Sequence, residues 1–219
     1  MSEWWTYSLS DFLLFSPRTY YRLLELYNVA IWPLQIAGVA AGLTLGVARL
    51  GKRSDRLRCA LLAACWLYVG WAFHHERYAQ INWAAQAFAA AFAVQSLLLI
   101  ALGTLGGVLR FRSPDGLQRW LTTTLLAFAL AAYPLQAPLA GRAWTTAEVF
   151  GTAPDPTALA TVALLAHVEG RLRWLLQAIP LAWCAIAAAT LWAIEAPERF
   201  VATGAMVMAI GIAVSSRAR

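Results

Sequence analysis

The side chains best suited to chemistry gather at the end of the second long apolar stretch of the sequence. His74, His75 and Glu76 follow one another there, and ionisable groups in or beside an apolar segment are candidates for a functional site. If this segment is one continuous helix, steps of three and four residues place five side chains on one face: Tyr68, Trp71, His75, Tyr78 and Asn82. We expect Trp71, His75, Tyr78 and Asn82, together with Asp155 from a later loop, to contact a substrate.

The same histidines predict a site for a divalent transition metal. Imidazole and carboxylate ligands suit zinc, copper or manganese, and the loop before the fifth apolar stretch supplies two carboxylates. The predicted ligands are His74, His75, Glu148 and Asp155. Two alternatives stay open, because these histidines also suit substrate contact or a purely interfacial role with hydrogen-bond partners. His74 points about 100° away from His75 on a helix, so the two need not share a ligand.

A Pro-Asp-Pro-Thr segment at residues 154–157 marks the start of the fifth apolar stretch. Asp155 suits the N-cap of a helix there, with Pro156 at the first helical position. Helix N-termini inside membrane proteins attract anions. The carboxylate of Asp155 opposes that attraction, so the sequence favours a bound cation or a plain structural cap.

Several cofactor and enzyme classes do not fit the sequence. A retinal Schiff base needs a lysine within a helix, whereas Lys52, the lysine of this chain, lies in a basic loop. A haem held by two histidines of one chain is also excluded, because His75 and His167 are predicted near opposite membrane surfaces. No G-x-S-x-G, H-E-x-x-H or P-loop motif is present. The three cysteines form no C-x-x-C pair and are expected to pack as small apolar side chains.

The elements that must position these residues are membrane helices. Of the 219 residues, 61% are hydrophobic and 13% are charged, against about 45–50% and 25% in soluble domains. This composition excludes a soluble enzyme, a disordered tail and a disulfide-rich secreted module. Helices are the expected spanning element, because a helix satisfies its backbone hydrogen bonds internally in lipid. The expected fold is an all-α polytopic bundle of about seven spans: 28–48, 58–76, 83–109, 119–140, 156–170, 172–194 and 199–215.

Residues 1–27 are expected to form an interfacial N-terminal segment, and residues 28–219 the transmembrane helical domain. Ser16 and Pro17 suit an N-cap and a first helical position. The amphipathic helix that follows presents tyrosines, which favour the membrane surface. The N-terminus has no basic region before an apolar stretch, so we expect no signal peptide.

The charges predict an orientation for these spans. The net charge is +6, and with alternating spans most of the cations fall on one side, which the positive-inside rule assigns to the cytoplasm. The N-terminus is then outside and the C-terminus cytoplasmic, in a bacterial inner membrane. We attribute the basic balance to this orientation and expect no nucleic-acid partner.

Two further patterns concern packing. Gly38, Gly42 and Gly46 form a small-xxx-small ladder, which allows close helix approach either within the chain or in a homo-oligomer. The segment Trp32-Pro33-Leu34-Gln35 has a weak echo in Tyr133-Pro134-Leu135-Gln136. The bilayer itself is the other expected partner.

Three short motifs stand out along the chain: Tyr27-Asn28 followed by Ile31-Trp32-Pro33-Leu34-Gln35, then Ile81-Asn82-Trp83-Ala84-Ala85, and Phe150-Gly151-Thr152-Ala153-Pro154-Asp155-Pro156-Thr157. Together they resemble the YN…WP.Q, IN.AA and FG..P.PT motifs of an uncharacterised family of bacterial multi-pass membrane proteins. The resemblance covers about residues 11–210 and implies a membrane topology and a bacterial origin, without an activity. Asp155 stands where the family motif has Cys, and Trp83 where it has Pro. The first departure removes a thiol-based role for that loop.

Three functions fit these expectations. The first is a small transporter or channel for an ion, a metal or a small solute, with a water-filled cavity reaching in from the His75–Asn82 face. The second is a non-catalytic membrane subunit or sensor that acts through partner proteins and has tightly packed spans. The third is a metal-dependent membrane enzyme with a metal near His75.

Overall fold

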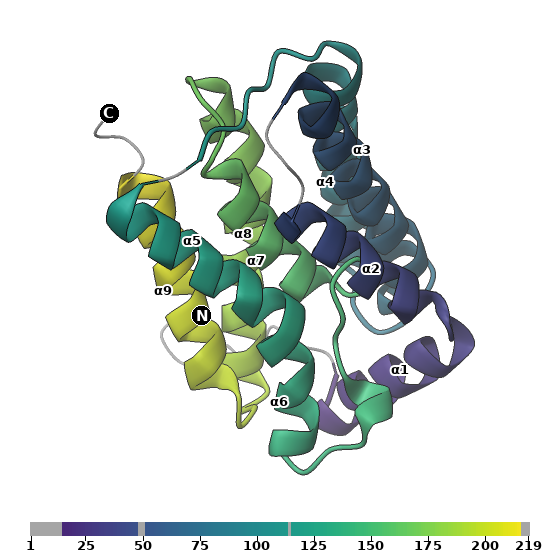
Figure 1. The fold of residues 1–219 in the computed structure, drawn as a ribbon. Coiled ribbons are helices and arrows are strands. Elements are labelled where there is room, and N and C mark those ends of the chain that lie inside the picture. Colours follow the sequence, from purple (N-terminus) through teal and green to yellow (C-terminus); the bar gives the residue numbers. More distant parts are fainter. Residues whose placement is uncertain (1–14, 48–50, 114, 216–219) are drawn as a thin grey trace, which may run out of the picture.

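The computed structural model describes residues 15–47, 51–113 and 115–215, which form an all-helical fold (Figure 1). The described part of the chain contains no strand, only one isolated bridge between Phe111 and Val168. The α-helices are α1 (Pro17–Ala30), α2 (Leu34–Val47), α3 (Lys52–Tyr68), α4 (Ala85–Leu98), α5 (Gly116–Ala127), α6 (Tyr133–Leu139), α7 (Pro154–Leu165), α8 (Leu172–Ala193) and α9 (Arg199–Ser215).

Wider helical turns lengthen three of these helices. The π-helical segments η3 (Val69–His75), η5 (Leu99–Leu105) and η6 (Phe128–Ala132) directly follow α3, α4 and α5. Since α6 begins where η6 ends, the chain is helical without interruption from residue 116 to residue 139. Two short 3₁₀ turns, η4 (Tyr78–Gln80) and η7 (Trp144–Thr146), belong to the connections.

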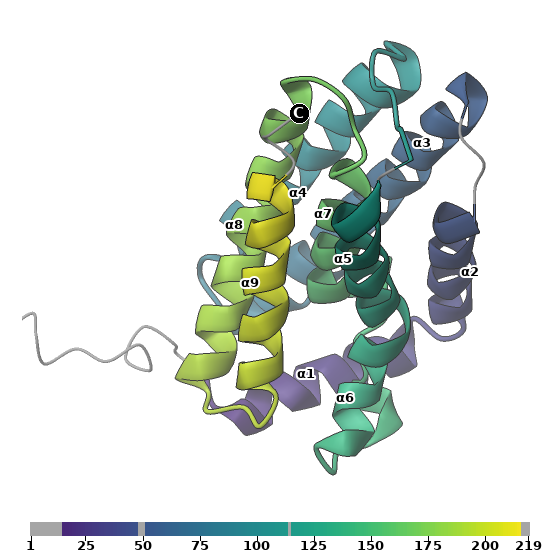
Figure 2. The ribbon, with the colours of Figure 1, turned by 60° about the vertical axis from the view of Figure 1, so that its left-hand side comes forward.

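Helix α1 crosses one end of the bundle, while the long helices run roughly alongside one another (Figure 2). The N-cap predicted from the sequence is confirmed, since Ser16 Oγ accepts a hydrogen bond of 3.2 Å from the Thr19 backbone N–H and Pro17 begins the helix. A bend of 89° separates α1 from α2. The buried face of α1 carries Tyr20, Leu24 and Tyr27. This is the geometry expected of an amphipathic helix that lies across the bundle end.

The prediction of seven complete spans is not confirmed. Among the described residues, three helices are long and apolar enough to cross a membrane: Lys52–Gln80, Ala85–Leu105 and Leu172–Ala193. The bent pair α1 and α2 gives a fourth if it is counted as one span. Helix α7 has 12 residues, which at 1.5 Å per residue cover about 18 Å of a core that is about 30 Å thick. The predicted fifth span, 156–170, is therefore too short to cross.

Helix α7 is instead the centre of the bundle. All 12 of its residues are buried, and it packs against α3, α5, α8, α9 and η6. A helix that is enclosed on every side is apolar all round, and the two threonines inside α7 have hydrogen-bond partners. Thr157 Oγ1 accepts from the Gly151 backbone N–H at 2.8 Å. Thr161 Oγ1 accepts from Trp66 Nε1 at 2.9 Å.

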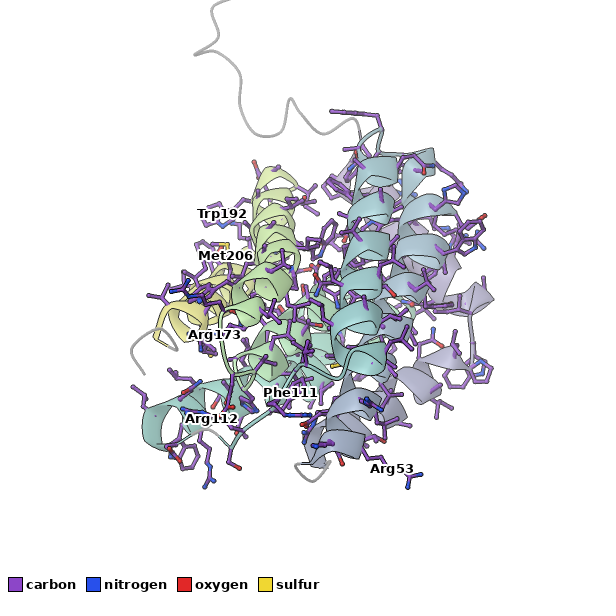
Figure 3. The ribbon with its side chains drawn as sticks, turned by 90° about the horizontal axis from the view of Figure 1, so that it is seen from above. Arg53, Phe111, Arg112, Arg173, Trp192 and Met206 are labelled. Carbon is purple, nitrogen blue, oxygen red and sulfur yellow. The ribbon has the colours of Figure 1, made fainter. Side chains whose placement is uncertain are left out.

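Three basic segments, which contain Arg53, Arg112 and Arg173, lie toward the end of the bundle opposite α1 (Figure 3). The starts of α3, α5 and α8 point to that end (Figure 1). Figure 3 looks onto this end and labels Arg53, Phe111, Arg112 and Arg173. Backbone hydrogen bonds join residues 110–112 to residues 167–169, with Arg112 N–H donating to the His167 carbonyl at 2.9 Å. The charge separation predicted from the sequence thus corresponds to two physical ends of the molecule.

The glycine ladder packs within the chain. A Cβ on Gly38 would collide with the carbonyl oxygen of Phe150, and one on Gly42 would collide with Leu130. These two glycines therefore let α2 approach the 149–151 loop and η6 closely. Gly38 and Gly42 already face their own chain. The predicted homo-oligomer contact through Gly38, Gly42 and Gly46 stays a prediction.

Candidate functional site

The loop before α7 is held by side chains of α1 and α2. Tyr27 Oη donates to the Thr152 carbonyl at 2.7 Å. Asn28 Nδ2 donates to the carbonyls of Thr145 and Ala147, each at 2.9 Å. Gln35 Nε2 then donates to the Asn28 carbonyl at 2.8 Å. The first and third sequence motifs therefore contact each other, and together they position the two carboxylates that flank this loop.

Asp155 is one of these carboxylates, and it is bound only by neutral donors. Its exposed fraction is 4%. Tyr133 Oη donates to Oδ2 at 2.7 Å, and Trp183 Nε1 donates to Oδ1 at 2.9 Å. The predicted capping role of Asp155 is wrong. The helix begins one residue earlier at Pro154, with Ala153 at the N-cap position, so the carboxylate is free to reach across to α6 and α8.

Glu148 is the second carboxylate, and it is less well bound. It is 8% exposed, and its Oε2 atom has no hydrogen-bond partner. Burial raises the pKa of Glu148 well above its ordinary value, and the nearby charge of Asp155 raises it further. Arg142 has a weaker opposite effect. Since an uncompensated buried carboxylate is costly, Glu148 favours its protonated form.

The nearest cation is already paired with a third acid. Arg142 Nη2 lies 2.6 Å from Glu198 Oε1, which also accepts a hydrogen bond of 3.2 Å from Tyr21 Oη. The guanidinium lies 4.0 Å above the Tyr21 ring. Among the described residues, neither Glu148 nor Asp155 has a cation at ion-pair distance. The site therefore holds three acids against one arginine.

Two small cavities are lined in part by Asp155, each of about 10 Å³, which is about the space that one water needs. One lies next to Tyr133 and Cys184. The other lies next to Tyr20, Tyr78 and Trp183. Asp155 is thus a lining residue that the two water-sized cavities share.

The predicted substrate face is only partly assembled. Tyr78 lines the same cavity as Asp155. Trp71 is 62% exposed and stacks on the His75 ring at 4.6 Å. Asn82 Oδ1 accepts from the Ala84 backbone N–H in a turn. The helix changes to a π-helix at Val69, so the α-helical spacing expected to place Tyr68 and Asn82 on the same face as His75 does not continue through this segment.

The predicted metal ligands do not come together either. No group of three or more His, Cys, Asp or Glu side chains in the described part of the chain is arranged to hold a metal ion. His75 is exposed and its Nδ1 lies 2.8 Å from Gln86 Oε1. His74 is buried between the rings of Phe92 and Trp183, and neither of its ring nitrogens has a hydrogen-bond partner. His74 therefore faces the interior and His75 faces outward.

The sequence did not identify the residues that surround the two carboxylates. Tyr133 opens the Tyr-Pro-Leu-Gln echo, which was the one indication of its importance. Trp183 lies in an apolar stretch with nothing to distinguish it. Arg142 and Glu198 flank helices far apart in the sequence, and only the folded chain brings them together.

Comparison with known families gives one match. The model of a family of unknown function (DUF6064) matches residues 18–219. No curated protein and no solved structure matches the chain.

Proposed function

The chain belongs to DUF6064, a family of unknown function, and we propose that it is an integral membrane protein that moves protons across a bacterial inner membrane, alone or in exchange for another small cation. Glu148 and Asp155 are the groups that bind the transported ion. The end that carries the basic segments faces the cytoplasm, in line with the positive-inside rule.

Membrane insertion is supported by the outward faces of the long helices. Three helices are long and apolar enough to span. Large apolar side chains are exposed along α4, α8 and α9, among them Leu97, Leu175 and Val207. Exposed apolar area on this scale suits contact with lipid rather than water.

The observation that carries the proposal is the burial of Glu148 and Asp155 without a cation. Ionisable groups inside a membrane bundle are rare and mark ion pathways or proton relays. Two carboxylates close enough to influence each other rarely ionise together in a dry interior. We therefore expect at least one of the pair to favour its protonated form.

The donors around Asp155 allow that proton to leave. Hydrogen bonds from Tyr133 and Trp183 stabilise the ionised carboxylate, whereas burial stabilises the neutral acid. These opposing effects bring the two states closer in free energy. Water in the small cavities lined by Asp155 supplies and removes the proton in this proposal. The short helix α7, which ends inside the bundle, resembles the broken helices that form ion sites in transporters.

The test is proton flux into vesicles. The protein is reconstituted in liposomes that contain a pH-sensitive dye, and a potassium gradient with valinomycin sets the membrane potential. We expect acidification with the wild-type protein and a fall to the rate of empty liposomes with Asp155→Asn. Glu148→Gln is expected to slow the flux as well. Glu76→Gln is the matched control, because Glu76 is an exposed carboxylate at the end of η3.

Wild-type flux no faster than that of empty liposomes would contradict the proposal. So would an Asp155→Asn variant that conducts as well as the wild type. The function would then be that of a tightly packed membrane subunit or sensor.

A further inference from the structure

A second polar site lies on the surface, in a groove between α1 and the turn that follows η3. The groove has a volume of about 390 Å³. Its lining includes three arginines and three apolar side chains: Arg18, Arg22, Arg77, Leu23, Leu26 and Ile81. Two segments far apart in the sequence thus contribute to it, and none of these six side chains lines a cavity next to Asp155.

The charge of this groove is only partly balanced. Arg22 pairs with Glu25 at 2.6 Å. Arg18 and Arg77 form no ion pair with any described residue. Guanidinium groups bind phosphate oxygens through two parallel N–H donors. The groove therefore has the charge and the hydrogen-bond donors for a phosphate group.

Three apolar side chains form another part of the wall. Leu26 is 50% exposed, and Leu23 and Ile81 continue the same wall. Because α1 crosses the end of the bundle (Figure 2), the proposed membrane placement puts this groove at the depth at which lipid headgroups meet acyl chains. A free phosphate ion would leave the apolar wall without a partner.

We propose that this groove binds an anionic phospholipid, with the phosphate between Arg18 and Arg77 and the start of an acyl chain along Leu23 and Leu26. The inference depends on the membrane placement of the chain and not on proton transport. Its failure leaves the flux experiment unaffected, and the reverse also holds.

The experiment is a lipid titration of the full chain in a neutral detergent, followed by native mass spectrometry. Phosphatidylglycerol is the anionic probe, phosphatidylcholine the zwitterionic probe, and inorganic phosphate the soluble competitor. We expect preferential binding of phosphatidylglycerol and a loss of about thirtyfold in affinity with the double variant Arg18→Gln/Arg77→Gln. That factor corresponds to about 2 kcal/mol, or about 1 kcal/mol for each arginine.

Two further variants keep the test interpretable. Arg53→Gln removes an exposed arginine at the opposite end of the bundle (Figure 3) and should leave lipid binding unchanged. Leu26→Gln should weaken phospholipid binding without affecting competition by inorganic phosphate. Unchanged phosphatidylglycerol binding in the double arginine variant would overturn the proposal. Complete competition by inorganic phosphate at equal concentration would also overturn it, because the groove would then be a plain anion site.

Discussion

The two ends of α7 bury carboxylates in opposite ways. At its N-terminal end, Asp155 and Glu148 have only neutral donors or none. At the other end, Asp55 is buried against Arg58, with Oδ1 and Nη1 3.2 Å apart. The Arg58 guanidinium also lies 5.4 Å from the centre of the Phe111 ring. One end therefore supplies the compensating cation, and the other does not.

Other polar groups near the two ends of α7 differ in the same way. Near the C-terminal end of α7, His167 Nε2 lies 3.0 Å from Thr122 Oγ1. Burial and the charge of Arg58 lower the pKa of His167 to about 4, so its ring is neutral at physiological pH. Oxygens of Glu148 and Glu198 at the other end have no partner. The difference indicates that the paired end fixes the fold, while the unpaired end retains groups that can change their protonation.

The largest expected loss of stability comes from breaking the paired end. Arg58→Ala leaves Asp55 buried without its cation, which costs about 3–5 kcal/mol in comparable buried pairs. Thermal unfolding in detergent, followed by circular dichroism, measures the change. The double variant Asp55→Leu/Arg58→Leu should recover most of the loss, because it removes both charges together. A single variant as stable as the wild type would show that this pair is not structural.

A smaller loss is expected where α2 touches the loop that carries Glu148. Gly38→Ala forces a methyl group against the Phe150 carbonyl, and such overpacking typically costs about 1–3 kcal/mol. Gly204→Ala in α9 is the control, because nothing lies within 4 Å of a Cβ there. Equal melting temperatures for the two variants would contradict the close packing described for α2.

Glu148→Gln should stabilise the folded protein modestly, by an amount that depends on pH. The folded protein raises the pKa of Glu148, so the stability tied to its protonated form is present at low pH and is lost as the pH rises through that raised value. The variant cannot ionise. It should unfold at a higher temperature than the wild type at pH 8. This difference in unfolding temperature should disappear near pH 4, which is close to the ordinary pKa of glutamate. A difference that does not depend on pH would mean that Glu148 does not titrate.

The smallest expected effect concerns the helix that covers the unpaired end. Ser16→Ala removes the oxygen that caps α1, a loss typically of about 1 kcal/mol. Ser16→Asp keeps an acceptor at the same position and should retain wild-type stability. Unchanged unfolding in Ser16→Ala would mean that packing of Tyr20 and Tyr27 alone holds α1 in place.

The sequence predicted the helices better than the way they cross the bundle. The start of α1 at Ser16–Pro17 is confirmed, because capping is a local interaction. The predicted span at 156–170 is not confirmed as a crossing segment, since α7 ends at Leu165. Composition alone does not distinguish a buried short helix from a lipid-facing long one. Only tertiary packing shows that α7 is enclosed.

The candidate site was predicted only in part, because its assembly also depends on tertiary packing. Asp155 and Glu148 stood out as charges beside apolar segments. His74 and His75 were predicted to be ligands together, whereas the structure buries His74 and leaves His75 exposed, because the sequence does not show which side of this helix packs against the bundle. Tyr133 and Trp183 reach Asp155 from helices 22 and 28 residues away in the chain, and a single sequence carries no information on such contacts.

The most direct test of this account is the protonation state of the two carboxyls at the N-terminal end of α7. Infrared difference spectroscopy of the protein in lipid detects the C=O stretch of a protonated carboxylic acid. We predict such a band at neutral pH, its loss on raising the pH, and a changed band in Glu148→Gln and Asp155→Asn but not in Glu76→Gln. A neutral-pH spectrum without this band, or one identical in all three variants, would contradict the claim that this site holds a proton.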